Sequence, residues 1–212
     1  MRIGIIGAGS LGSALGERLG GAGHEIMFGG GDSAREVAGR IAADVGSNSD
    51  AAAFGDVVVL AVPFAAIEAA LDDAATEGRV LWSCVNALSP DLSGLAVGFD
   101  TSAAEQVARH ARGARVVAAI PPFAQAIASG TLAYDEGLAP SVFLCSDDPA
   151  AKQVVERLVR DLGAHPVDAG QLSAARLVEP AMMLLIGLAS AGAPRDVGLR
   201  LLERTADSGS ER

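Results

Sequence analysis

Positive charge is scarce in this chain, and lysine is almost absent. The 212 residues include 16 Lys and Arg against 26 Asp and Glu, a formal net charge of −10, and Lys152 is the one lysine. Binding to nucleic acid or to an anionic membrane surface relies on clustered basic side chains that release counterions. Because the sequence contains no such cluster, we expect neither nucleic acid nor a membrane among its partners.

Side chains that carry acid-base or metal chemistry are also few. The one tyrosine, Tyr134, has no lysine near it, and Lys152 is expected on an outward-facing helix, which excludes the Tyr-x-x-x-Lys arrangement of many alcohol dehydrogenases. The three histidines precede strands or lie in a charged turn, and no nucleophile elbow, H-E-x-x-H motif or metal-ligand spacing occurs. We therefore predict no metal site and no catalytic side chain.

Cysteines and long apolar runs are limited as well. Cys84 and Cys145 each end an apolar strand-like run, which is typical of a buried thiol rather than a disulfide. The first strand begins at the N-terminus and leaves no room for a cleavable signal segment, so we expect a cytoplasmic protein. The uncharged stretch "PAMMLLIGLASAGAP" from Pro180 is shorter than the roughly 20 residues that span a bilayer.

What the chain does contain is an alternation of strand and helix patterns, in which 50% of the residues are hydrophobic. This is typical of an α/β fold with a parallel sheet covered by helices on both faces. Ser102 and Glu105 predict a capping box at the start of one helix, and Asp148, Pro149 and Gly163 predict the cap, first residue and end of another. Strands are predicted at residues 2–7, 24–29, 56–62, 79–85, 115–120, 141–145 and 165–169.

We predict two parts in the chain. Residues 1–170 form a Rossmann-type, doubly wound domain with a mainly parallel sheet, and residues 171–212 form a small C-terminal helical extension. The segment 172–191 is apolar on nearly every face beyond Glu179, which the surface helix of a monomer would not tolerate. We expect this segment to form a homodimer interface, followed by a short helix around residues 199–202 and a polar tail.

The turn after the first strand lies in "IGIIGAGSLGSALGERL", from Ile3, and carries a G-x-G-x-x-G pattern between a strand and an amphipathic helix. In such a turn Gly7 lets the chain leave the strand, Gly9 lets the backbone approach a pyrophosphate, and Gly12 lets helix and strand pack closely. The N-terminus of the following helix supplies N–H donors and a positive partial charge. The pattern predicts a bound dinucleotide.

The choice between NAD and NADP falls at the end of the second strand, where an acid binds a ribose hydroxyl or an arginine binds the 2′-phosphate. In "FGGGDSAR" Asp32 suits the first role and Arg35 the second, while Asp32 equally suits a helix cap, so these residues leave the preference open. A dinucleotide site without an evident acid or base indicates hydride exchange with an acceptor that needs little proton help, such as another redox cofactor.

Several segments together resemble a known family. Besides the glycine-rich turn they are "DVVVLAVPFAAIEAAL", "SGLAVGFDTSAAEQVA", "GARVVAAI" and, most specific, "VDAGQLSAARLVEP". They are similar to the NADP oxidoreductases that depend on the deazaflavin coenzyme F420, a family similar in turn to the cytosolic domain of STEAP metalloreductases. The resemblance covers Met1 to about Ala191. It implies a homodimer that transfers hydride between NADP(H) and coenzyme F420 in a cleft at the carboxyl edge of the sheet.

The resemblance also implies the residues of the site. Those expected to bind the dinucleotide are Gly7, Gly9, Ser10, Leu11, Gly12, Gly30, Gly31, Arg35, Ala61, Val62, Pro63 and Asn86. Pro121, Pro122 and Phe123 are expected in the acceptor pocket, and Met182 and Met183 of the late apolar segment are expected to complete an apolar pocket with Phe123, above all for a small organic substrate. Two segments depart from the family: Gly30-Gly31 replaces a Ser-Arg pair near the 2′-phosphate, and "PPFAQ" from Pro121 replaces a more polar acceptor segment.

Two other functions stay open on the sequence. One is an NAD(P)H-dependent reductase of a small organic C=N, C=C or C=O substrate, for which Tyr134, Asp135 and Glu179 are the candidate proton donors. The other is a regulator that binds a dinucleotide without turnover.

Overall fold

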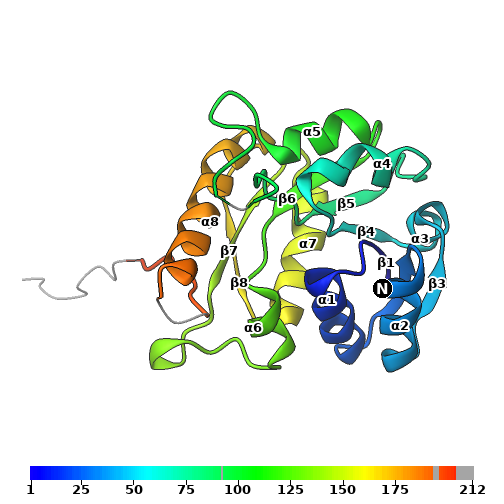
Figure 1. Cartoon of the computed structure of the whole chain (residues 1–212), viewed down its shortest axis with the longest axis horizontal. Coiled ribbons are helices and arrows are strands. Elements are labelled where there is room, and N and C mark those ends of the chain that lie inside the picture. The colour runs from blue at the N-terminus through cyan, green and yellow to red at the C-terminus, as the bar shows by residue number, and fades with distance from the viewer. Residues whose placement is uncertain (92, 193–195, 204–212) are drawn as a thin grey trace, which may run out of the picture.

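The computed structural model describes residues 1–91, 93–192 and 196–203, which fold around one eight-stranded sheet (Figure 1). The strands are β1 (Arg2–Ile6), β2 (Glu25–Gly29), β3 (Asp44–Gly46), β4 (Val57–Leu60), β5 (Val80–Ser83), β6 (Arg115–Ala119), β7 (Ser141–Cys145) and β8 (His165–Asp168). Their order across the sheet is β3-β2-β1-β4-β5-β6-β7-β8. Neighbouring strands are parallel except β6 and β7, which run antiparallel. The predicted Rossmann-type α/β fold with a mainly parallel sheet is confirmed.

Helices cover both faces of this sheet. The α-helices are α1 (Ser10–Gly21), α2 (Asp32–Ile41), α3 (Asn48–Phe54), α4 (Ile67–Leu71), α5 (Ala103–His110), α6 (Ala124–Ala128), α7 (Pro149–Leu162) and α8 (Ala175–Ser190). Short 3₁₀ segments are η1 (Phe64–Ala66), η2 (Asp135–Gly137) and η3 (Leu172–Ala174).

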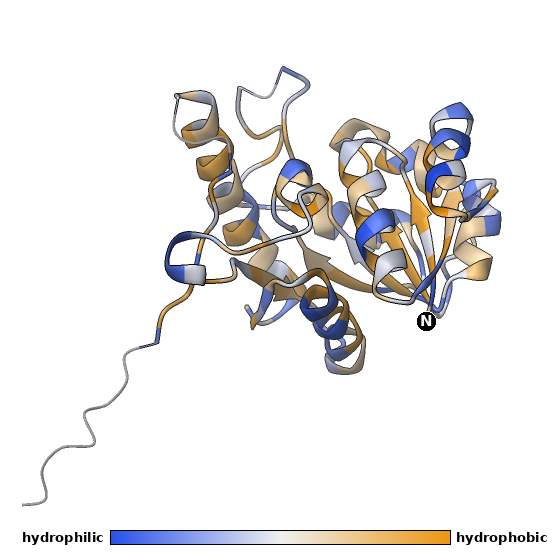
Figure 2. Ribbon diagram, turned by 90° about the horizontal axis from the view of Figure 1, so that it is seen from below, coloured by the Kyte–Doolittle hydropathy of each residue, from blue (hydrophilic) through white to orange (hydrophobic). Residues whose placement is uncertain are grey.

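The alternation of side chains along each strand builds one hydrophobic core on each face. In β4, Val57 and Val59 belong to the core that contains residues of α1, α2, α6 and α7. Val58 and Leu60 belong to the other core, with residues of α4, α5 and η3. Figure 2 shows the strands as a largely hydrophobic layer between helices that carry both kinds of residue. Both faces of the sheet are therefore buried, as the near-continuous apolar strands predict.

The strand β3 and the helix α3 that follows it lie outside the predictions, as does the short helix α6. β3 has 3 residues at the edge of the sheet, too few to show a periodic pattern. α3 begins with a capping box in which Ser47 Oγ accepts from Asp50 N at 3.1 Å and Asp50 Oδ2 accepts from Ser47 N at 2.8 Å. The spacing of Ser47 and Asp50 in the sequence is therefore a signal from which the start of this helix could have been predicted.

The capping box predicted at Ser102 is half right. Ser102 Oγ accepts from Glu105 N at 3.1 Å, as expected for a cap. The Glu105 carboxylate, however, accepts from Ser102 Oγ at 2.9 Å and from two nitrogens of Arg176 at 2.9 and 2.6 Å. A charged partner on α8 draws the carboxylate away from the backbone N–H that a capping box would use.

The helix predicted around residues 199–202 is wrong. Residues 196–203 are irregular, and they lie against the start of β7. Leu199 O accepts from Ser141 N at 2.7 Å, and Leu201 N donates to Ser141 Oγ at 3.0 Å. These hydrogen bonds satisfy backbone groups that a helix would have paired internally. The predicted polar tail, residues 204–212, lies outside the described residues.

The helix α7 follows its sequence signals closely. Asp148 caps it, Pro149 is its first residue, and Gly163 follows its end with a φ of +93°. The outward orientation expected for Lys152 is wrong: this side chain is buried, and its Nζ donates to Asp168 Oδ1 and Gly170 O, each at 2.7 Å. The predicted burial of both cysteines is confirmed.

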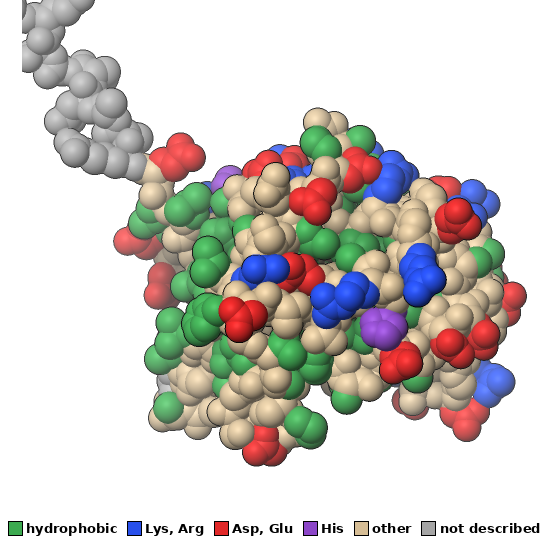
Figure 3. Space-filling view, turned by 90° about the horizontal axis from the view of Figure 1, so that it is seen from above, with side chains coloured by type: hydrophobic (Ala, Val, Ile, Leu, Met, Phe, Trp, Pro, Cys, Tyr) green, Lys and Arg blue, Asp and Glu red, His purple; other side chains and the backbone are tan. Residues whose placement is uncertain are grey.

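The helix α8 is more exposed than any core helix would be. Together with η3 it forms 19 helical residues, Leu172–Ser190, which by length and composition alone could cross a membrane. Leu177, Leu184 and Leu188 are 69%, 59% and 45% exposed. Figure 3 shows hydrophobic side chains gathered at the left end of one face, the end at which Figure 1 places α8. Apolar surfaces of this kind are typical of interaction sites.

Candidate functional site

The glycine-rich turn between β1 and α1 has a geometry that requires its glycines. Gly7 adopts a φ of +106°, which disfavours any side chain. A Cβ on Gly12 would collide with the carbonyl oxygen of Gly7, so the close approach of helix and turn depends on glycine there. At Gly9 a Cβ would meet no atom within 4 Å. The backbone at Gly9 is therefore open to a ligand.

The N-terminus of α1 opens at the same place. Its N-cap residue is Gly9, and no side chain caps this helix. The backbone N–H groups of the first turn have no acceptor within a helix, and here no capping side chain accepts from them either. The helix dipole places a positive partial charge beside them. Such a terminus binds phosphate through backbone donors alone.

A cavity of about 680 Å³ lies next to the glycine-rich turn, at the carboxyl ends of the central strands. The lining residues from the glycine-rich turn and from the segments that follow β4 and β5, which we call the glycine-turn wall, are Gly9, Ser10, Leu11, Ala61, Val62, Pro63, Phe64, Ala65, Cys84 and Asn86. The other lining residues, which we call the far wall, are Leu88, Ser89, Pro90, Ile120, Pro121, Pro122, Phe123, Ala124, Pro140, Ser141, Met182, Leu185, Ile186, Val197, Gly198 and Leu199.

This cavity brings together many residues that the sequence predicts for the site. The glycine-turn wall contains Gly9, Ser10, Leu11, Ala61, Val62, Pro63 and Asn86, and the far wall contains Pro121, Pro122, Phe123 and Met182. Met183 is not among the lining residues. Leu185 and Ile186 line the cavity with Met182 instead, because residues three and four apart share one face of a helix.

The last part of the far wall, Val197, Gly198 and Leu199, has no counterpart in the predictions. These residues come from the irregular C-terminal segment, whose course depends on its hydrogen bonds to Ser141 and, through Arg200 Nη1, to Ala139 O at 3.0 Å. No local sequence pattern signals contacts between segments about 60 residues apart. The two walls together are largely apolar.

The cavity offers shape rather than acid or base groups. Among its lining residues, all within the described part of the chain, only Cys84 has a titratable side chain. Burial raises the pKa of the Cys84 thiol well above its ordinary value, so the thiol stays protonated. Asn86 is the main polar side chain at the end of β5; its Nδ2 donates to Glu179 O at 3.4 Å, and its Oδ1 has no partner among the described residues.

The three candidate proton donors lie outside the cavity lining. The Tyr134 hydroxyl is buried without a hydrogen-bond partner in the described chain, and burial raises its pKa. Asp135 is exposed on η2. The Glu179 carboxylate accepts from Ala103 N and Ala104 N at 2.9 and 3.1 Å, and burial raises its pKa to about 6.

Two adjoining clefts continue from the glycine-rich turn past the end of β2. The first, about 300 Å³, is lined by Ile6, Gly7, Ala8, Gly29, Gly30, Gly31, Asp32, Ser33, Ala34, Asn48 and Val62. The second, about 680 Å³, is lined by Gly30, Arg35, Val45, Gly46, Ser47, Asn48, Ser49, Ala69, Ala70 and Asp73. The predicted residues Gly30, Gly31 and Arg35 thus lie here, beside polar residues of α3 that the predictions did not include.

Asp32 does not cap α2. It is the first residue of the helix, after the N-cap Gly31, and its Oδ1 pairs with Arg35 Nη1 at 2.6 Å. Both side chains are exposed, so water screens this pair and its contribution to stability is small. Among the residues that line these clefts, all within the described part of the chain, Arg35 is the basic one, and its guanidinium pairs with Asp32.

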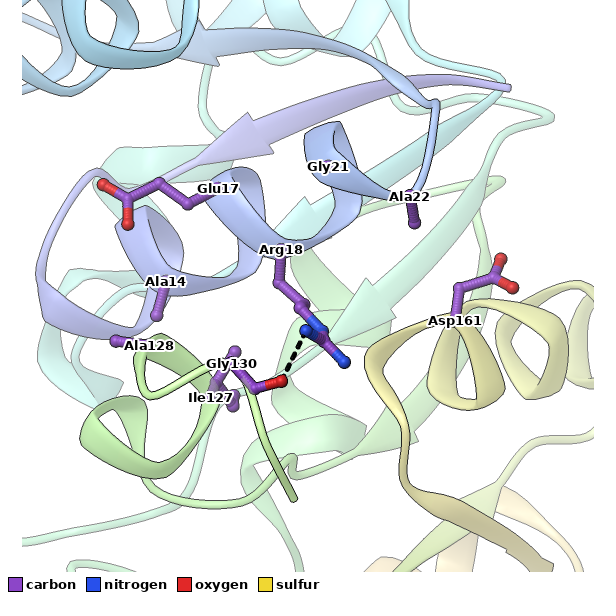
Figure 4. A pocket seen from close by; sticks show the side chains of 9 residues that line it. All are labelled: Ala14, Glu17, Arg18, Gly21, Ala22, Ile127, Ala128, Gly130 and Asp161. Atoms are coloured by element: carbon purple, nitrogen blue, oxygen red, sulfur yellow. Dashed lines mark hydrogen bonds between the residues drawn. The ribbon is translucent and has the colours of Figure 1, made fainter. Parts of the chain in front are cut away.

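Another cleft, of about 470 Å³, lies at the C-terminal end of α1 (Figure 4). Arg18 crosses it, and its guanidinium donates to Gly130 O at 2.7 Å and to Leu162 O at 3.2 Å. These bonds satisfy one carbonyl at the end of α7 and one near the start of the loop that follows α6. Since this cleft lies at the opposite end of α1 from the glycine-rich turn, it has no part in the candidate site.

The family model of coenzyme F420-dependent NADP oxidoreductases matches residues 2–87. The F420-dependent NADP reductase of Methanothermobacter thermautotrophicus is 33% identical, over 95% of this chain and 94% of the relative, and that of Methanothermobacter marburgensis is 31% identical, over 95% and 98%. A protein from Arthrobacter sp. FB24, described on its structure solution as a candidate F420-dependent NADP reductase, superposes with a TM-score of 0.84 at 25% identity, over 95% of this chain and 99% of its own.

Proposed function

This chain belongs to the family of F420-dependent NADP reductases; it transfers hydride between NADP(H) and coenzyme F420, and we propose that the transfer takes place in the cavity between the glycine-turn wall and the far wall. The observation that carries the proposal is the position of this cavity. It touches the open backbone at Gly9 and the uncapped start of α1, and it is also lined by largely apolar residues from five separate segments of the chain.

The residues present fit a dinucleotide. Gly7, Gly9 and the first turn of α1 would hold its pyrophosphate through backbone N–H groups, with Gly12 keeping helix and turn in contact. The clefts past β2 would hold the adenosine half, with Gly30, Gly31 and Arg35 near the 2′-phosphate. Arg35 would have to exchange its bond to Asp32 for one to the phosphate, which makes this pair the determinant of the preference for NADP over NAD.

Ala61, Val62, Pro63 and Asn86 would flank the nicotinamide, and Pro121, Pro122, Phe123 and Met182 would flank the deazaflavin. The two coenzymes supply the redox chemistry themselves, as hydride donor and acceptor. The protein's part is to align the two rings and to exclude water, for which apolar walls without acid or base groups are suited. No catalytic side chain is needed for this assignment.

The same proposal includes the organisation of the chain. Residues 1–170 would bind the dinucleotide, and residues from 171 onward would complete the acceptor side and form a homodimer. The exposed leucines of α8 support the dimer, because a second copy of the same helix offers a matching apolar face. The proposal also places the protein in the cytoplasm, with the apolar face of α8 covered by the second copy rather than by a membrane.

The test mixes the protein with oxidised F420 and, separately, with NADPH or NADH, and follows the visible absorbance of the deazaflavin. We expect bleaching with NADPH. Phe123→Ala should raise the KM for F420 and leave the affinity for NADPH unchanged, whereas the control Phe99→Ala, in which an exposed phenylalanine outside the cavity is removed, should change neither. Binding of both nucleotides without bleaching would instead favour a small organic acceptor or a regulatory role.

A further inference from the structure

We propose that Glu179 is a positioning residue for the hydride exchange: its carboxylate clasps α8 to the first turn of α5 and so fixes the part of the far wall that α8 supplies. The proposal rests on the assignment of the far wall to the acceptor.

The contacts of the carboxylate are specific. Glu179 is 3% exposed, its Oε2 accepts from Ala103 N at 2.9 Å, and its Oε1 accepts from Ala104 N at 3.1 Å. Both N–H groups belong to the first turn of α5, where no intrahelical acceptor exists. Hydrogen bonds to an ionised acceptor are stronger than those between neutral groups, and here they join two helices.

Glu179 is also one of the few anchors that α8 has. Ala175 and Glu179 are the buried residues of this helix, whereas Leu184 and Leu188, further along, are exposed. The other link to α5, the pair between Arg176 and Glu105, is only partly buried. The fully buried contacts of α8 are thus concentrated in its first half, where Glu179 supplies the charged one.

Two residues connect the clasp, by which we mean the Glu179 carboxylate and its two hydrogen bonds to α5, with the cavity. Met182, which lines the far wall, follows Glu179 by three residues and so lies one turn further along the same helix. Asn86, of the glycine-turn wall, donates from Nδ2 to the carbonyl of Glu179 at 3.4 Å. A shift of α8 at Glu179 would therefore change the separation of the two walls.

A carboxylate at this position has an energetic cost as well as a structural role. Burial, with repulsion from Glu105, opposes ionisation of Glu179, and its pKa is raised to about 6. An apolar side chain would fill the same space without this penalty but would leave two buried N–H groups of α5 unpaired. The carboxylate thus specifies one position of α8 on α5.

The experiment compares the wild-type chain with Glu179→Ala, Glu179→Gln and Ser102→Ala. Ser102→Ala is the matched control, because it removes the other side-chain cap of α5 and one hydrogen bond to Glu105, while both hydrogen bonds of the Glu179 carboxylate and those from Arg176 to Glu105 are kept. For each folded variant we measure the KM for F420, kcat, the Kd for NADPH by fluorescence titration, and amide hydrogen exchange over residues 175–190. We expect Glu179→Ala to raise the KM for F420 by about tenfold and to speed exchange beyond Met182, with the NADPH Kd unchanged.

Glu179→Gln keeps one acceptor oxygen and should fall between the wild type and Glu179→Ala, so it carries the test if the alanine variant does not fold. An unchanged KM for F420 in Glu179→Ala, or an equal rise in Ser102→Ala, would overturn the proposal. If the wild-type chain does not react with F420 at all, the proposed function fails, and exchange over residues 175–190 decides the clasp: faster exchange in Glu179→Ala alone supports it, and equal exchange refutes it.

Discussion

Replacing Gly9 and Gly12 by alanine should separate ligand binding from stability within one turn. Gly9 has a φ of −73° and a ψ of −172°, which alanine also adopts, and a Cβ there meets no atom within 4 Å. Gly9→Ala should therefore leave the melting temperature nearly unchanged. Its Cβ would stand where the pyrophosphate approaches the backbone, so we expect NADPH to bind about 100-fold more weakly, a loss of about 2.7 kcal/mol.

Gly12→Ala should do the reverse. Its Cβ would collide with the carbonyl oxygen of Gly7, a backbone atom that cannot rotate away. Overpacking of this kind costs about 1–3 kcal/mol, and about 2–4 °C in melting temperature for each kcal/mol in a chain of this size. Gly12→Ala should thus melt several degrees lower even without ligand.

Thermal unfolding with and without NADPH measures both effects. Wild-type protein at a ligand concentration of about 100 Kd should gain about 2.7 kcal/mol, and Gly9→Ala at the same concentration less than about 0.5 kcal/mol. A full NADPH shift in Gly9→Ala would refute the placement of the pyrophosphate at this turn. Unchanged stability of Gly12→Ala would refute the packing argument.

Four further outcomes follow from the structure. Tyr134→Phe should change kcat with F420 by less than about twofold, because the hydroxyl lies outside the cavity lining, and steady-state kinetics checks this. Arg35→Ala should lower kcat/KM with NADPH relative to NADH by about tenfold, the worth of one charge-assisted hydrogen bond to the 2′-phosphate. Leu184→Glu should convert a dimer to a monomer in light scattering, since it places a charge on the exposed face of α8. Glu179 has a pKa of about 6 in the folded chain and a lower one when unfolded, so its contribution to the free energy of unfolding rises as pH falls. Between pH 7 and pH 5 the free energy of unfolding of the wild type, measured with urea, should rise by about 1 kcal/mol relative to that of Glu179→Gln. A fall relative to Glu179→Gln would contradict this direction.

Local signals predicted most of the fold. The seven longer strands and the ends of α7 follow from apolar runs and from the caps Asp148 and Gly163, because these features act over a few neighbouring residues. The strand β3 was too short to carry a pattern. The segment 196–203 became irregular because Ser141 offers it hydrogen bonds, which no local propensity records.

The site, too, has a part that local sequence predicts and a part that depends on distant contacts. Gly7, Gly9 and Gly12 could be assigned roles from their spacing, since the turn is local and its requirements are steric. The far wall is assembled from the segments that follow β5 and β6, from the start of β7, from α8 and from the C-terminal segment, so its composition depends on how distant elements pack. The single lysine shows the limit most clearly: Lys152 occupies a helix position that reads as exposed, yet it is buried because Asp168 and Gly170 supply its partners.

The reversal of β7 against β6 has a consequence for how such a protein can diversify. Because β7 runs opposite to β6, the end of one strand and the beginning of the next lie on the same edge, and the loop of residues 120–140 that joins them contributes its first residues and its last, Pro140, to one wall. The glycine-rich turn lies far from this loop in the chain. Replacement of this loop and of the C-terminal segment by other sequences would therefore alter which molecule exchanges hydride with the dinucleotide, while the dinucleotide-binding part of the chain stays the same.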